Sequence, residues 1–86
     1  MTSQRYTVVL SPSAKRAIER DLPEAVAAAC LEFLFGPLAE NPHEVGKQLR
    51  YDLEGLYSAR RGQYRVIYSL QDAQVLVTVV RISHRG

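Results

Sequence analysis

The sequence predicts an α+β fold, in which an N-terminal strand and a helical hairpin pack on one face of a small, mainly antiparallel β-sheet. Strand-forming residues open the chain (YTVVL, 6–10) and fill its second half, whereas apolar residues recur at helical spacing only between them. The 86 residues suffice for one domain over 1–86, and 47% of them are hydrophobic, which is ample for a core.

The N-terminal half predicts one strand followed by two helices. Residues 6–10 are β-branched and aromatic, which favours a strand. Ser11 is a helix cap, and Pro12 suits the first helical position. Pro23 breaks the helical pattern and starts a second helix, which Gly36 and Pro37 end. The two helices therefore form a hairpin whose apolar face needs a sheet to cover.

The C-terminal half predicts a loop and then antiparallel strands. Residues 38–46 predict a loop and 47–53 a strand, with turns at Gly55 and Gly62. The clearest strands are 64–70 and 75–82. Asp72 and Ala73 between them indicate a two-residue hairpin loop, although the preferred glycine is absent.

A two-residue loop fixes a register for this hairpin. If Gln71 opposes Gln74, opposing residue numbers sum to 145, so Val66 faces Val79 and Tyr68 faces Val77. Because side chains alternate across a sheet, those four apolar residues share one face, which we assign to the helices. The opposite, open face then holds Arg65, Ile67, Ser69, Thr78, Val80 and Ile82.

Charge is distributed unevenly along the chain. Residues 1–44 hold four basic and six acidic residues (−2), whereas residues 45–86 hold seven basic and three acidic residues (+4). A basic half indicates a polyanionic partner, of which nucleic acid is the usual case. The single cysteine, Cys30, excludes an intramolecular disulfide, and the N-terminus has no apolar stretch typical of a signal peptide. We therefore expect a cytoplasmic protein without a membrane-spanning segment.

Three arginines lie within six residues of the predicted sheet. Arg60, Arg61 and Arg65 each carry a planar fork of donors that matches phosphate oxygens. The alternatives are structural: Arg65 as an ion-pair partner, and Arg60 and Arg61 as a charged strand edge that prevents aggregation. A phosphate-facing surface explains all three together. The two histidines, the cysteine and the acidic residues form no motif typical of a metal site.

Residues 53–68, LEGLYSARRGQYRVIY, resemble the core of the RelE-type toxins of the RelE/ParE superfamily. That core reads L-x-G-x-Y/W-S-x-R-x-G-x-Y/H-R, followed by two aliphatic residues and tyrosine. The resemblance implies a toxin of a type II toxin–antitoxin system that enters the ribosomal A site and cuts mRNA there. In such toxins the neighbouring ribose 2′-hydroxyl is the nucleophile, and no metal or cofactor takes part.

The resemblance also implies the site residues and partners. Arg65 matches the strand arginine that holds the scissile phosphate, Arg85 the second essential arginine, and His84 a position where a lysine or histidine can act as the acid. Arg60 joins this catalytic set. The expected RNA and ribosome contacts are Lys47, Arg50, Arg61, Arg81 and a base-stacking Tyr57. The implied partners are the ribosome, mRNA and a RelB-like antitoxin, with operator DNA bound only through the antitoxin.

The chain departs from the family pattern in two places. Many members carry basic residues at or near positions 56 and 58, where this chain has Leu56 and Ser58. The sequence also ends at Gly86, before the C-terminal tyrosine or arginine of relatives, which predicts weakened activity. The alternatives are a ParE-like DNA gyrase poison without chemistry, and a degenerate toxin that only binds its antitoxin. The dense set of arginines at 60, 61, 65 and 85 favours the ribonuclease.

Overall fold

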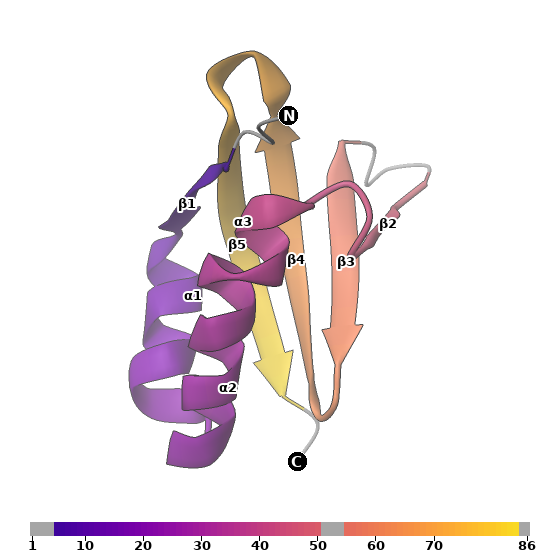
Figure 1. The fold of residues 1–86 in the computed structure, drawn as a ribbon. Coiled ribbons are helices and arrows are strands. Elements are labelled where there is room, and N and C mark those ends of the chain that lie inside the picture. Colours follow the sequence, from indigo (N-terminus) through magenta and orange to yellow (C-terminus); the bar gives the residue numbers. More distant parts are fainter. Residues whose placement is uncertain (1–4, 51–54, 85–86) are drawn as a thin grey trace.

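A mixed β-sheet forms the centre of the fold. The computed structural model describes residues 5–50 and 55–84. Within these ranges, five strands lie in the order β1-β5-β4-β3-β2. They are β1 (Thr7–Leu10), β2 (Lys47–Gln48), β3 (Leu56–Arg61), β4 (Tyr64–Gln71) and β5 (Leu76–His84). β1 is parallel to β5, and the other neighbouring pairs are antiparallel (Figure 1).

The helices lie together on one face of this sheet (Figure 1). They are α1 (Pro12–Arg16), the π-helical turn η1 (Ala17–Asp21), α2 (Glu24–Phe35) and α3 (Pro37–Glu40). Ser11 caps α1 as predicted, because its Oγ accepts the Ala14 N–H at 3.1 Å. The same Oγ donates to the Val80 carbonyl at 2.7 Å, which fastens the start of the helix to β5. The predicted α+β class, with a helical hairpin on one face, is confirmed.

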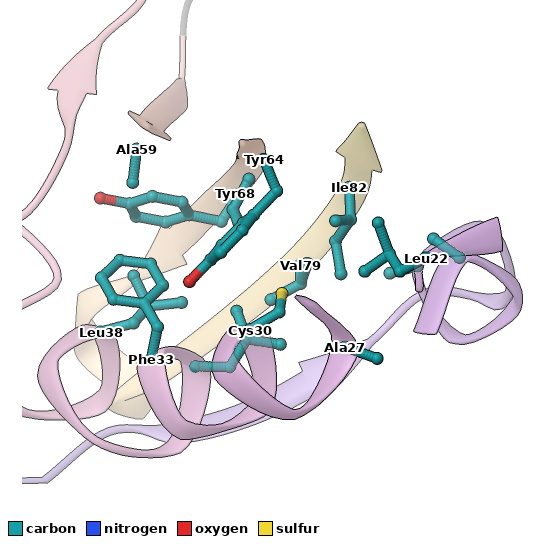
Figure 2. Packing of buried hydrophobic residues seen from close by; sticks show 14 of the residues in the cluster. Leu22, Ala27, Cys30, Phe33, Leu38, Ala59, Tyr64, Tyr68, Val79 and Ile82 are labelled. Carbon is teal, nitrogen blue, oxygen red and sulfur yellow. The ribbon is translucent and has the colours of Figure 1, made fainter. Parts of the chain in front are cut away.

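The core lies between α2 and the inner face of the sheet (Figure 2). Cys30, Phe33 and Leu34 of α2 and Leu38 of α3 pack against the sheet. The predicted inner-face residues of β4 and β5 are all fully buried: Val66, Tyr68, Val77 and Val79. Side chains of alternating strand positions thus meet the apolar helical stripe, as the pattern predicted. Within the described residues, no helix is long and apolar enough to cross a bilayer.

Two predictions around residues 37–53 were wrong in extent. Residues 37–40 form the short helix α3 rather than the start of a loop, because Pro37 sits at its first turn and Leu38 and Ala39 bury their side chains in the core. The strand predicted over 47–53 is confined to Lys47–Gln48 among the described residues, and its last part, 51–53, lies outside them.

The β4–β5 hairpin has a longer turn than predicted. A 3₁₀ turn, η3 (Asp72–Gln74), and Val75 in the left-handed conformation (φ 52°) join the strands, so Gln71 opposes Leu76. The tight two-residue turn would need residues tolerant of positive φ, and the chain offers no glycine or asparagine there. The predicted pairs Val66–Val79 and Tyr68–Val77 are therefore wrong: Tyr68 opposes Val79, and Leu70 opposes Val77.

A β-bulge then changes which residues of β5 face the core. The register shifts between Ile67 and Tyr68, so that Val66 opposes Ile82 and Arg65 opposes Ser83. Ile82, predicted on the open face, is only 6% exposed and belongs to the core. Arg65 and Val80 are exposed on the open face as predicted, and Ile67, Ser69 and Thr78 are partly exposed there.

Candidate functional site

An open pocket of about 460 Å³ lies where the β3–β4 turn meets the end of β5. Its lining comprises Arg60, Gly62, Gln63, Tyr64, Arg65, Ser83 and His84. Three of the four predicted catalytic residues are among them, although they come from different strands. The fourth, Arg85, lies outside the described residues, so its role stays a prediction.

The β3–β4 hairpin brings two guanidinium groups together. Gly62 has φ 53° at the first of the two residues between the strands, the position where a type II′ turn needs positive φ. This tight turn places Arg60 directly opposite Arg65. Like charges opposite each other destabilise a sheet, and both residues are exposed. Folding alone does not explain the pair, and an anion bound between the two cations stays a prediction.

The cations of the open face have no acidic partner among the described residues. The ion pairs within residues 5–50 and 55–84 are Arg5–Glu40 and His43–Asp72. Arg60, Arg65, Lys47 and Arg81 take part in neither, and no carboxylate of a described residue lines the pocket. Arg65 as a structural ion-pair partner, the alternative open at the level of sequence, therefore has no support in the described residues.

His84 and Tyr64 line the pocket from the helix face of the sheet, because they alternate along β5 and β4 with Ser83 and Arg65 of the open face. They oppose each other across β4 and β5, and the Nε2 atom of His84 is buried without a hydrogen-bond partner among the described residues. Burial is the main cause that raises the pKa of the Tyr64 phenol, and Cys30 raises this pKa further. The positive charge of Arg61 lowers it by a smaller amount, so the net shift is upward. Tyr64 therefore stays protonated near neutral pH, and the role of His84 as the acid stays a prediction.

The predicted RNA contacts divide between the two faces. Lys47 and Arg81 lie on the open face with Arg65, and Arg50 is exposed just after β2. Arg61 and Tyr57 lie on the helix face instead. The Arg61 guanidinium stacks over the Phe33 ring, 4.8 Å from its centroid, and Tyr57 stacks on Tyr68 at 5.5 Å. The predicted roles of Arg61 and Tyr57 remain untested, but the structure places both side chains on the face opposite Arg65.

A polar cluster at the other end of the sheet has no counterpart in the sequence analysis. The Asp72 carboxylate accepts a 2.7 Å hydrogen bond from the Tyr6 hydroxyl and lies 2.9 Å from His43 Nε2. Tyr57 lies beside His43, with 5.8 Å between ring centroids. Asp72 stands 29 residues after His43, and no motif connects them. Ser83 of the pocket was missed because the predicted register of β5 was wrong, and Gln63 of the β3–β4 turn was missed as well.

Comparison with known proteins places the chain in a family. Residues 8–86 match the family described as ParE toxin of type II toxin–antitoxin system, parDE. Toxin RelE of Mycobacterium tuberculosis is 54% identical over 81 residues, which cover 94% of this chain and 82% of that protein. Toxin RelG of the same organism is 44% identical and is covered to 92%.

Solved structures agree with these relatives. The toxin–antitoxin complex RelBE2 of M. tuberculosis contains a chain that is 42% identical, with a TM-score of 0.92 over 98% of this chain and 95% of that one. The archaeal RelE–RelB complex from Pyrococcus horikoshii matches at 28% identity, with a TM-score of 0.65 over 95% and 97%. Isolated RelE of Escherichia coli shares the fold, with a TM-score of 0.74 and 19% identity over 94% of this chain and 85% of that one. The chain belongs to the RelE/ParE superfamily of type II toxin–antitoxin toxins and is a RelE-type member of it.

Proposed function

We propose that this toxin is a ribosome-dependent endoribonuclease that cuts mRNA in the A site through the ribose 2′-hydroxyl. The observation that carries the proposal is the Arg60–Arg65 pair at an open pocket whose described lining residues include no carboxylate. Two exposed cations beside the β3–β4 turn match the charge and oxygen geometry of a phosphodiester. The resemblance to RelE-type toxins supplies the reaction class, and the pocket supplies groups that fit it.

The proposed chemistry uses Arg60 and Arg65 of the open face together with His84, which opposes Tyr64 at the same end of the sheet. The 2′-oxygen attacks phosphorus, the bond to the 5′-oxygen breaks, and the products are a 2′,3′-cyclic phosphate and a 5′-hydroxyl. Arg60 and Arg65 stabilise the negative charge that grows on the phosphorane oxygens. His84 donates a proton to the leaving 5′-oxygen, and Arg85 adds a further positive charge. Since Tyr64 stays a phenol, the proton of the 2′-hydroxyl passes to water.

The proposed partners follow from the same reaction. A RelB-like antitoxin would cover the basic open face and block the pocket, and the two related complexes each contain an antitoxin beside the toxin. Operator DNA would be bound only through that antitoxin. Because the substrate is mRNA on the ribosome, the site of action is the cytoplasm, and neither a metal nor a cofactor is needed.

The test maps the 3′ ends of an mRNA after the toxin meets bacterial ribosomes paused on it. Cuts within the A-site codon, found only with ribosomes and persisting in a chelator, are the expected result. A matched mRNA with a single 2′-deoxy nucleotide at the cut position should resist cleavage, since the nucleophile is missing. Cutting of that mRNA, or equal cutting of ribosome-free RNA, would contradict the proposal.

A second candidate is a poison of DNA gyrase, and the description of the matched family as ParE toxin is the observation that favours it. A gyrase poison would trap enzyme-cleaved DNA and leave ribosome-bound mRNA intact. A supercoiling assay with purified gyrase, run beside the ribosome assay, separates the two functions. A degenerate toxin would be inactive in both assays and still bind the antitoxin.

A further inference from the structure

We propose that Lys47 and Arg81 are phosphate contacts that flank the pocket. They would hold the RNA phosphates that precede and follow the phosphate bound by Arg60 and Arg65. This inference rests on the proposed function and adds to it the path of the RNA strand across the sheet. It also gives each of the two residues a defined place along the substrate, in place of a general contact with the ribosome.

The register of the sheet places the two residues in one row. Lys47 opposes Ser58, Ser58 opposes Ile67, and Ile67 opposes Arg81, so the row crosses β2, β3, β4 and β5. The adjacent row on the same face contains Arg60, Arg65 and Ser83. Each of four consecutive strands therefore contributes one cation. Their order across the sheet is Lys47, Arg60, Arg65 and Arg81.

The β-bulge is what brings Arg81 to this face. If the pairing of Tyr68 with Val79 continued without a shift, Arg81 would oppose Val66 and point into the core. The shift between Ile67 and Tyr68 instead gives the core position to Ile82 and turns Arg81 and Ser83 outward. Bulges often lie near functional sites, where they redirect a side chain. Here the redirected side chain joins Lys47, Arg60 and Arg65 on the open face, and none of the four has an acidic partner within residues 5–50 and 55–84.

Spacing separates the outer cations from the central pair. Neighbouring strands lie about 4.8 Å apart, so the backbones at Lys47 and Arg81 are roughly 14 Å apart, whereas those of Arg60 and Arg65 are about 5 Å apart. One phosphate can contact the central pair. The outer two lie on opposite sides of it, and uncharged Ser58 and Ile67 lie between them. Neither outer cation forms an ion pair with a described residue.

The first experiment measures binding without chemistry. A short single strand of 2′-O-methyl RNA cannot be cut, and its affinity is measured against salt for wild type, Lys47→Gln and Arg81→Gln. Each lost phosphate contact should reduce the slope of log K against log salt by about 0.7. Lys15→Gln, an exposed lysine of α1 on the helix side, is the matched control and should keep the wild-type slope. Unchanged slopes for both test variants would overturn the inference.

The second experiment assigns each residue to its phosphate. A methylphosphonate removes the charge of one phosphate, on the 5′ or the 3′ side of the central one. Wild type should lose about tenfold in affinity at either position. Lys47→Gln should become insensitive to one substitution and Arg81→Gln to the other. If both variants keep the sensitivity of wild type, the two residues do not flank the pocket. If the slopes and sensitivities are as expected but ribosome-bound mRNA stays uncut, the phosphate contacts are supported. In that case only the proposed ribonuclease activity is refuted.

Discussion

Two arginines that oppose each other on an exposed strand pair repel each other unless an anion lies near them. Arg60 and Arg65 are such a pair, and the described residues offer neither of them a carboxylate. The sequence could predict a functional role for both arginines, because a sheet that only has to fold does not need two arginines there. It could not predict that Arg61 points the other way, since that depends on which residue of the hairpin begins the turn.

Replacing Arg65 with alanine should abolish cleavage and leave the fold intact. The side chain is exposed on the open face, so its removal creates no cavity, whereas the loss of charge at the phosphate should lower the rate at least about 100-fold. The measurement is single-turnover cleavage of ribosome-bound mRNA, with circular dichroism of the same sample. Arg16→Ala, an exposed arginine of α1, is the control and should cut normally. An unfolded Arg65→Ala variant would show that the face was assigned wrongly.

Gly46→Ala should destabilise the protein by about 1–3 kcal/mol, because the site has no room for a methyl group. A Cβ there would clash with the Tyr68 hydroxyl and lie 2.9 Å from the Ser58 carbonyl oxygen. That hydroxyl donates a buried 2.6 Å hydrogen bond to the Pro42 carbonyl, so it cannot easily move. Urea denaturation gives the free energy of unfolding. In the Tyr68→Phe background the cost of Gly46→Ala should shrink, and an equal cost in both backgrounds would exclude this clash.

Among the elements, the β4–β5 hairpin shows best what the sequence can and cannot predict. Alternation of apolar residues identified both strands and four of their buried positions correctly. Neither the turn length nor the bulge was predicted. Each changes the register by only one or two residues, and the apolar pattern of the two strands is compatible with both registers. One extra residue at the bulge exchanges the two faces of β5 beyond it, so Ile82 was predicted outside and Ser83 was not recognised as a pocket residue.

A matched pair of substitutions in β5 tests the bulged register. Ile82→Ala should lower the free energy of unfolding by about 2–4 kcal/mol, because the side chain is buried in the core. Val80→Ala should cost less than about 1 kcal/mol, since Val80 is 37% exposed. Both free energies come from urea denaturation. Equal and small costs would mean that β5 pairs with β4 as the two-residue turn predicted, with both side chains on the open face.

The turn between these strands should make stability depend on acid. Hydrogen bonds from Tyr6 and His43 lower the pKa of Asp72 below its ordinary 3.8. A carboxyl group whose pKa is lower in the folded state stabilises fully above its unfolded pKa. That stabilisation is lost as the pH falls through the folded pKa. Between about pH 5 and about pH 2, the urea midpoint of Asp72→Asn should therefore fall less than that of wild type. Tyr6→Phe, which removes the largest cause, should lie between them, and parallel curves would contradict the account.

At the scale of the whole molecule, the sequence predicted the order of the helices and strands and the excess of basic residues in the second half. It did not predict which of these residues come together in the site. A helical hairpin that needs cover, followed by antiparallel strands, leaves little choice of architecture. The cations of the basic half, however, divide between two faces and several strands. Lys47 and Arg81 stand 34 positions apart in the chain, and only the pairing of β2 to β5 puts them in one row.

Cys30 should report the opening of the whole domain. It lies in the core between α2 and the sheet, and burial raises the pKa of its thiol to about 11. Near pH 8 the folded protein therefore presents almost no reactive thiolate, and alkylation by iodoacetamide must wait for unfolding. The labelling rate, measured by mass spectrometry, should then equal the unfolded fraction multiplied by the rate for a denatured chain.

Gly46→Ala provides the internal check on this reporter. Each 1.4 kcal/mol of lost stability raises the unfolded fraction about tenfold, so the variant should label faster by the factor that its urea curve predicts. That agreement would show that the helices and the sheet open together, as expected of one small domain with one core. If Gly46→Ala changed the urea curve and left the labelling rate of Cys30 unchanged, α2 would be opening separately from the sheet that carries the site.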